Sequence, residues 1–261
     1  MKKSIDRAYK IVDSSELIVI KLIEKYAVIM YELGYDSARY KRSYKHRLSS
    51  VEGVDTAVKQ LEYELTIVIE RLLEELNTIS RLATDEYTDE ESDDLWLFKP
   101  FLASVIFGST FNKRIKSATN RLVKEIDEHL GYALDSNLSK RSAKKSFLKE
   151  LTSPARKKTP SPFKSELVGR KAVSTLTYLF DDTLNRGFHE ANIYYWTKAG
   201  IQMKYIVAVL DSRTCPVCTD LHLRIFNVDE QILPVHGSCR CEEYPLDDNY
   251  YRGYTVNNLE F

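Results

Sequence analysis

Apolar side chains recur at three- and four-residue steps through most of the chain, a spacing that places them on one face of a helix. The clearest stripe runs from Val54 to Leu82, with Glu and Lys at many of the intervening positions. The pattern also predicts helices from residue 1 to about 48, from Arg114 to Leu134 and from Ser165 to Gly200. Each apolar stripe needs a surface to cover it, so we expect the helices to pack on one another.

The pattern changes after Gly200. Residues Lys204 to Leu210 form the only convincing strand, because the segment is rich in β-branched side chains and has a suitable length. A further short strand is possible from Cys239 to Tyr244. We therefore expect a mainly α fold, in which a helical N-terminal region is followed by a small C-terminal α+β module. That module would hold a long helix, short antiparallel strands and a zinc-knuckle-like cysteine cluster.

Composition agrees with this fold and limits the function. Only 9 Gly and 7 Pro occur in 261 residues, so few tight turns are expected. The 38 basic and 38 acidic residues cancel, which argues against a chain that binds nucleic acid over its whole surface. The apolar stretch from Leu17 to Lys25 is broken by charges before it could span a membrane. We expect a soluble protein, made in a reducing cytosol, with no membrane partner.

A basic stretch divides the chain. Eleven basic and two acidic residues lie between Leu138 and Lys171, together with three prolines that favour an extended linker or arm. The predicted domains are a helical domain at 1–137, a basic proline-containing linker at 138–165 and the C-terminal module at 166–261. The linker is either a solvated connection or an arm that contacts DNA or an acidic protein surface. Its candidate nucleic-acid-binding residues are Lys140, Arg141, Lys144, Lys145, Arg156, Lys157 and Lys158.

All four cysteines lie between residues 215 and 241, which indicates a local role. Cys215 and Cys218 have the spacing of a zinc knuckle, in which a tight turn brings two thiolates to one metal. The second half is His236-x2-Cys239-x-Cys241, and Cys239 and Cys241 share one face if they lie on a strand. These five residues are candidates for four positions. Structural zinc is bound by four protein ligands, so we expect a closed, non-catalytic zinc site.

Other interpretations of the cluster remain open. The thiols could form disulfides or pack as small apolar side chains. A zinc-containing enzyme or toxin acting on nucleic acid could use His236 with acidic neighbours such as Asp211. However, the chain lacks the His-x-Glu of zinc deaminases, a phosphate-binding loop and a nucleophile elbow, so we expect no enzyme and no small-molecule substrate. His222, between the two halves, is interpreted as a surface or hydrogen-bonded histidine.

Residues 166 to 246 resemble the phage Mu F-like minor head proteins, also called phage head morphogenesis proteins. The resemblance lies in the order and spacing of four short motifs. They are Lys198-Ala-Gly200, then Asp211-Ser-Arg-Thr-Cys-Pro-Val-Cys218, then Leu221-His-Leu-Arg-Ile-Phe226, then Pro234-Val-His-Gly-Ser-Cys-Arg-Cys241. The chain departs from the family in lacking its Thr-Glu pair in the long helix, and in having Leu223 and Gly237 where a Gly and a Pro are usual.

The resemblance implies a structural minor capsid protein of a tailed bacteriophage, associated with the portal vertex and needed for head assembly. Its partners would be the portal protein and the major capsid protein, with packaged DNA as a further contact. The protein would be made in the bacterial cytoplasm and located in the virion. A DNA-binding accessory protein acting through the basic linker is the other alternative.

Overall fold

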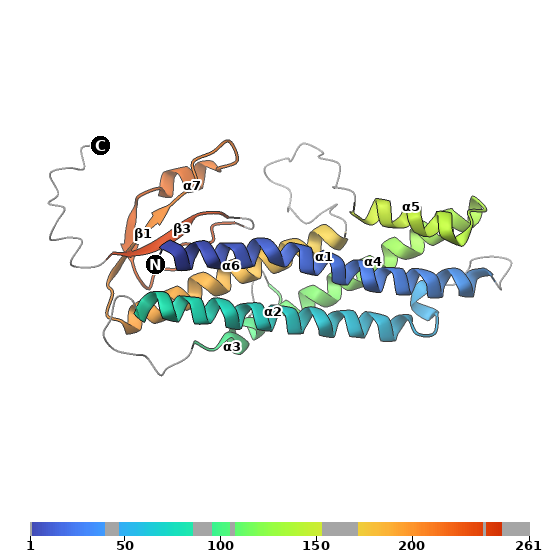
Figure 1. The fold of residues 1–261 in the computed structure, drawn as a ribbon, viewed down its shortest axis with the longest axis horizontal. Coiled ribbons are helices and arrows are strands. Elements are labelled where there is room, and N and C mark those ends of the chain that lie inside the picture. The colour runs from blue at the N-terminus through green and yellow to red at the C-terminus, as the bar shows by residue number, and fades with distance from the viewer. Residues whose placement is uncertain are drawn as a thin grey trace. The chain divides into compact units, whose positions relative to one another are not determined.

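The computed structural model describes residues 2–39, 47–85, 96–104, 108–152, 172–236 and 239–246. As expected, the fold is mainly helical, with a small antiparallel sheet near the C-terminal end (Figure 1). Among the described residues, no helix is both long and apolar enough to cross a membrane. In chain order, the elements are α1 (Lys2–Arg39), the 3-10 helix η1 (Leu48–Ser50), α2 (Val54–Asp85), α3 (Phe98–Ala103), α4 (Phe111–Asp135), α5 (Lys140–Thr152), α6 (Ala172–Lys198), β1 (Met203–Val207), α7 (Pro216–Leu221), β2 (Ile225–Asn227) and β3 (Glu242–Leu246).

Contacts divide the chain into two units, each built from non-consecutive segments. Unit 1 comprises Met1–Val12, Arg71–Phe101 and Asp181–Phe261, and unit 2 comprises Asp13–Glu70 and Leu102–Phe180. The domains expected from the sequence were consecutive stretches. The difference arises because α1, α2 and α6 each contribute residues to both units.

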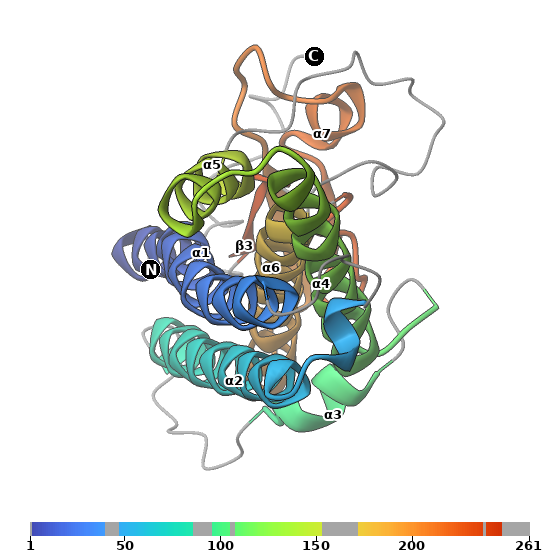
Figure 2. The same ribbon diagram turned by 90° about the vertical axis from the view of Figure 1, so that its right-hand side faces the viewer.

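Unit 2 is a helical unit whose core comes from the apolar stripes found in the sequence. Leu61 and Leu65 of α2 and Leu122 and Ile126 of α4 are completely buried. The short helix η1 lies against α4, where the Leu48 backbone N–H donates to a carboxylate oxygen of Asp127 at 2.9 Å (Figure 2). The helical periodicity of the sequence therefore correctly predicted α2 and α4 and the faces that they bury.

Helix α5 corrects part of the linker prediction. Residues 140–152 are helical, whereas we expected them to belong to an extended segment. The first proline of this region is Pro154, so no residue inside α5 lacks a backbone donor. The apolar face of α5 is buried, and the Phe147 ring stacks on Tyr31 of α1 with 4.7 Å between ring centroids. Residues 153–165 of the predicted linker lie outside the described part of the chain.

Unit 1 contains the sheet, in which β1 is the central strand and pairs antiparallel with β2 and with β3. Only β1 was a firm prediction, and it ends at Val207 rather than at Leu210. Buried and half-buried side chains alternate along β1 and β3. Tyr205 lies opposite Tyr244 on the more open face, where their rings stack with 5.5 Å between centroids. The stack supports the register through a cross-strand aromatic pair.

The end of α6 follows directly from its sequence. Gly200 has a φ of 77°, a left-handed conformation that glycine adopts without strain. The Ile201 N–H donates to the Trp196 carbonyl at 3.0 Å, and the Gly200 N–H donates to the Thr197 carbonyl at 3.1 Å. These two bonds form a Schellman motif. The helix therefore stops where the sequence predicted, and the chain turns into β1.

A buried polar network connects segments of unit 1 that are far apart in sequence. The Tyr195 hydroxyl donates to the Asn77 side-chain oxygen at 2.7 Å and accepts the Trp96 backbone N–H at 3.2 Å. The Asn77 amide donates to the Trp96 carbonyl at 3.3 Å. One hydroxyl therefore satisfies a donor and an acceptor of two buried residues.

We predict that Tyr195→Phe destabilises the protein by about 1–3 kcal/mol, because it leaves the Trp96 N–H and the Asn77 oxygen buried without a partner. Urea denaturation monitored by circular dichroism measures the effect. Tyr194→Phe, at a half-buried neighbouring position, is the matched control and should change stability by less than about 0.5 kcal/mol. Equal effects of the two substitutions would contradict the role given to the Tyr195 hydroxyl.

Candidate metal centre

The first half of the cysteine cluster is a helix start. Cys215 is the N-cap of α7, and its sulfur accepts the Cys218 backbone N–H at 3.3 Å. Pro216 occupies the first helical turn, where its missing N–H costs nothing. Because Cys218 lies one turn further along the helix, its thiol projects beside that of Cys215. The Cys-x2-Cys spacing thus places the two thiols side by side, as the sequence predicted.

The second half lies before β3, and residues 239 to 241 lead directly into that strand. The Cys239 N–H donates to the His236 carbonyl at 3.1 Å. Cys239 and Cys241 are buried, whereas Arg240 between them is half-exposed. The alternation places both thiols on one face, as expected from the Cys-x-Cys spacing.

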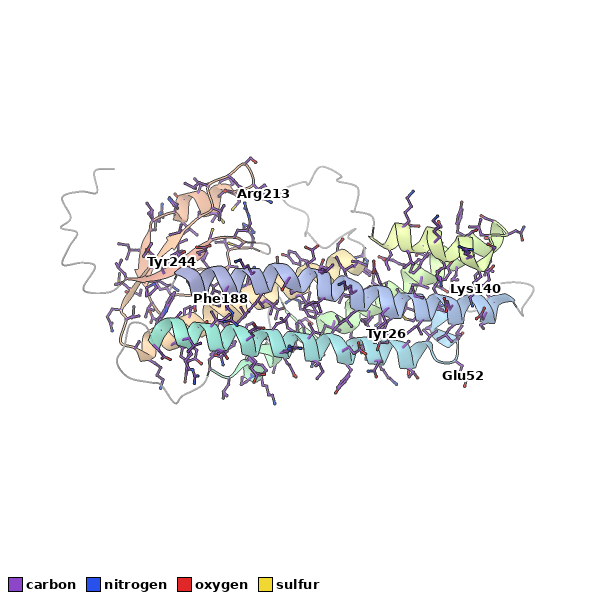
Figure 3. All side chains as sticks on the ribbon, in the orientation of Figure 1. Tyr26, Glu52, Lys140, Phe188, Arg213 and Tyr244 are labelled. Atoms are coloured by element: carbon purple, nitrogen blue, oxygen red, sulfur yellow. The ribbon has the colours of Figure 1, made fainter. Side chains whose placement is uncertain are left out.

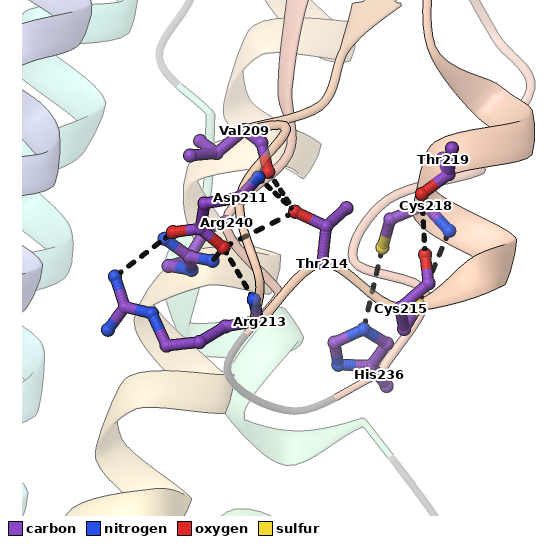
Figure 4. A network of polar contacts seen from close by, with 9 residues as sticks. All are labelled: Val209, Asp211, Arg213, Thr214, Cys215, Cys218, Thr219, His236 and Arg240. Carbon is purple, nitrogen blue, oxygen red and sulfur yellow. Dashed lines mark hydrogen bonds and ion pairs between the residues drawn. The ribbon is translucent and has the colours of Figure 1, made fainter.

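The structure brings the two halves together at Cys218. Its sulfur lies 3.4 Å from the Nε2 atom of His236 (Figure 4). The same sulfur lies 3.9 Å from the Cys239 sulfur. Thiolates on a tetrahedral zinc ion, with Zn–S bonds of 2.3 Å, are about 3.8 Å apart. The Cys218–Cys239 separation therefore already fits two ligands of one ion.

All five predicted ligands lie around this point. Their ligand atoms form two groups, each within 4.8 Å, and Cys218 belongs to both. One group is Cys215, Cys218 and His236, and the other is Cys218, Cys239 and Cys241. The four cysteines are free thiols, so the disulfide interpretation has no bond in this structure to support it. The buried cluster of Cys218, Cys239 and Cys241 can hold a metal ion.

Apolar side chains enclose the thiols. Ile206 and Ala208 from the β1 region and Leu233 from the loop before His236 are buried against Cys218, Cys239 and Cys241. Further apolar contacts come from half-buried residues, namely Leu221, Phe226, Ile232 and Val235. A shell of this kind excludes water and lowers the local dielectric constant, which strengthens the attraction between thiolates and a cation.

The four thiols differ in pKa because they cannot all ionise close together. The hydrogen bond from the Cys241 thiol lowers the pKa of Cys239 to about 5, and the same bond raises the pKa of Cys241. Burial raises the pKa of Cys218 to about 12. Burial also acts to raise the pKa of Cys215, but hydrogen bonds from the Cys218 N–H and thiol and from His236 outweigh it and lower that pKa. Cys239 and Cys215 thus ionise more readily than a free thiol, whereas Cys218 and Cys241 ionise less readily.

A bidentate ion pair joins the loop before Cys215 to the segment that carries Cys239 and Cys241. Arg240 donates to the two carboxylate oxygens of Asp211 at 2.7 and 2.9 Å (Figure 4). These bonds, with a further one from the Arg213 backbone N–H, hold the pKa of Asp211 well below its usual range. The pair lies at the surface, so its contribution is geometric, because the fork of the guanidinium fixes the two segments relative to each other.

Thr214 organises the loop between Asp211 and Cys215. The Asp211 N–H donates to the Thr214 hydroxyl at 2.9 Å, and that hydroxyl donates to the Val209 carbonyl. The Thr214 N–H in turn donates to the Asp211 carbonyl at 3.0 Å. The Asp-x-Arg-Thr motif is therefore a turn that delivers Cys215 to the start of α7. Sequence reasoning identified the motif but missed that Asp211 pairs with Arg240, which lies 29 residues further along the chain.

Other sequence candidates lie outside the centre. The Ala208 N–H donates to the Nδ1 atom of His222 at 3.1 Å, so His222 is a hydrogen-bonded histidine and belongs to neither ligand group. Among the candidate nucleic-acid residues, Lys140 (labelled in Figure 3) and Lys144 lie on α5. They form ion pairs with Asp36 and Glu32 of α1 at 2.7 and 2.6 Å. Arg141 and Lys145 are exposed on α5, and Arg156, Lys157 and Lys158 lie outside the described residues.

We predict that metal binding releases protons at neutral pH, because Cys218 and Cys241 have raised pKa values and are protonated without a cation. Apparent affinity should therefore fall as the pH is lowered, by roughly ten-fold per pH unit for each proton released. Calorimetry in buffers of different ionisation enthalpy measures the number of protons. His222→Gln should leave the number unchanged, and binding without proton release would contradict the pKa assignments.

Comparisons of the chain with protein-family models, with curated proteins and with solved structures give no match. The case for function therefore rests on the chemistry of the cysteine cluster and on the motifs that surround it. That chemistry identifies a candidate metal centre with protein ligands from two segments of unit 1.

Proposed function

We propose that this chain is a structural minor head protein of a tailed bacteriophage, and that one zinc ion closes its C-terminal module. The observation that carries the proposal is the convergence of three buried thiols, Cys218, Cys239 and Cys241, with Cys215 and His236 beside them. A small module with a three-stranded sheet has little core of its own, and structural zinc supplies folding free energy in such modules.

The donor set favours zinc over other metals. Thiolate and imidazole ligands in a tetrahedral arrangement suit zinc, whereas magnesium and calcium require oxygen ligands. Five candidate side chains are available for four positions, so protein ligands can fill the coordination sphere. A filled sphere leaves no place for a reactive water molecule, which supports a structural role over a catalytic one.

The surroundings of the cluster also favour a structural role. A nucleic-acid-acting enzyme at this site would need His236 free of the metal, but the His236 ring lies 3.4 Å from the Cys218 sulfur within a ligand group. Asp211, a possible catalytic acid, is held by Arg240 and by the backbone of its own loop. We therefore favour the structural protein over the zinc enzyme or toxin.

The phage assignment is supported by the residues that carry the resemblance. Asp211 and Thr214 shape the turn before Cys215, and Arg240 holds the Cys239–Cys241 segment against it. All three residues belong to the motifs that carry the resemblance. Each makes a hydrogen bond that orders a segment next to a cysteine of the cluster. A shared pattern of this kind is more specific than cysteine spacing alone. The portal protein and the major capsid protein remain the proposed partners.

We predict that the purified protein contains about one zinc ion per chain, measured by elemental analysis, and that chelation lowers its melting temperature. Cys218→Ser should abolish binding, because Cys218 belongs to both ligand groups. Arg224→Gln, which lies just after α7 and removes an exposed ion pair with Asp220, is the matched control and should retain the metal. Protein that lacks metal and contains intact disulfides would refute the zinc site.

For the phage assignment, we expect the chain to copurify with portal and major capsid proteins in particles separated on a density gradient. Mass spectrometry of the particles measures its presence. A phage that lacks the chain should form few filled heads, and expression of the chain from a plasmid should restore them. A chain that is absent from particles and dispensable for their assembly would exclude the virion role.

A further inference from the structure

Three charged or titratable side chains meet where β1, β3 and α6 pack in unit 1. The Lys204 ammonium lies 3.1 Å from Glu243 Oε2, and the His189 Nδ1 atom lies 2.9 Å from Glu243 Oε1. Lys204 is 0% exposed, and Glu243 and His189 are each 2% exposed. We call these three residues the buried triad. Its members come from β1, α6 and β3, so no single element contains the contact.

The buried triad is costly to form and costly to break. Each charge loses its hydration, and the attraction between the partners offsets that loss only if the geometry is maintained. Glu243 has a partner at each carboxylate oxygen, Lys204 at Oε2 and His189 at Oε1. Buried ion pairs contribute little net stability, and their best-attested use is to specify one register or one packing over another.

The β3 register that brings Glu243 to Lys204 and His189 also orients the thiols of Cys239 and Cys241. Cys239, Cys241 and Glu243 follow at two-residue steps and are all buried. Arg240 and Glu242, which alternate with them, are half-exposed. A slip of β3 by one residue would turn both thiols away from Cys218 and would remove Glu243 from Lys204 in the same movement.

The central strand β1 contributes residues both to the buried triad and to the apolar shell of the thiols. Lys204, in the buried triad, and Ile206, in the apolar shell of the thiols, lie on the same buried face of β1. In the sheet, Ile206 is opposite Glu243. The labelled side chains Phe188 on α6 and Tyr244 on β3 are the immediate sequence neighbours of His189 and Glu243 (Figure 3). The buried triad and the apolar shell of the thiols thus share one face of β1, and Cys241 directly precedes β3.

We propose that Glu243, held by Lys204 and His189, is a positioning residue for the metal centre. It fixes the register of β3 and so places the thiols of Cys239 and Cys241 opposite Cys218. The inference rests on the proposed metal site and assigns a role to three residues that are not ligands. Because coupling between two sites is reciprocal, the metal also stabilises the buried triad.

Titration with Co²⁺, whose charge-transfer absorption reports thiolate coordination, tests the proposal. Glu243→Gln and Lys204→Met should each weaken Co²⁺ binding by roughly ten-fold or more, which is the size of effect that supporting residues have on metal affinity. Glu243→Asp keeps the charge and should recover part of the loss. Glu242→Gln removes the same charge from the half-exposed neighbouring position and should stay within about two-fold of the wild-type affinity.

The outcomes separate the two proposals. Wild-type protein that shows no thiolate–Co²⁺ absorption overturns the metal site itself. A second outcome is that wild-type protein binds Co²⁺, and that Glu243→Gln and Lys204→Met bind it with the same affinity as Glu242→Gln. That outcome leaves the metal site intact and overturns the positioning role.

Hydrogen exchange on wild-type protein provides a test that does not depend on the folding of any variant. Chelation should accelerate exchange of backbone amides across the β1–β3 pair, including those of Lys204 and Glu243. As an internal control, exchange along α4 in unit 2 should not change. Unchanged exchange at the β1–β3 pair after metal removal would overturn the coupling.

Discussion

The constraint on which this protein's C-terminal module depends is that thiols buried close together cannot all ionise without a cation. Cys218 lies near the thiols of two segments and the ring of His236, and its burial disfavours the thiolate form. A bound divalent cation would stabilise the thiolates together, and the apolar side chains around them would limit screening by water. The surrounding turns and strands can be understood as the geometry that keeps these thiols together.

Three local devices provide that geometry. Cys215 caps α7 and sets the distance to Cys218, and the Asp211–Arg240 pair ties the first loop to the second cysteine segment. Third, every second side chain from Cys239 onward is buried, so Cys239, Cys241 and Glu243 lie on one face. The metal centre and the buried triad are therefore two parts of one packed face, and whatever stabilises one favours the register that the other needs.

The helical part of the chain shows a different use of charge. Lys140 and Lys144, which the sequence presented as candidates for nucleic-acid contacts, form exposed ion pairs with acidic residues of α1. Such pairs contribute little stability, and the packing of α5 comes from its apolar face, where Phe147 stacks on Tyr31. This use of charge agrees with the structural role that we propose for the chain.

Hydrophobic periodicity alone determined the main helices, because residues three and four apart share a helix face whatever surrounds them. Spacing alone also placed the cysteines in two halves and set Cys239 and Cys241 on one face. Only the tertiary structure decided that residues 140–152 are helical, that β2 and β3 pair with β1, and that Asp211 meets Arg240. The same holds for the contact of Glu243 with Lys204 and His189. These partners are separated by tens of residues, and long-range pairing leaves no local pattern, since it depends on how the already formed elements pack.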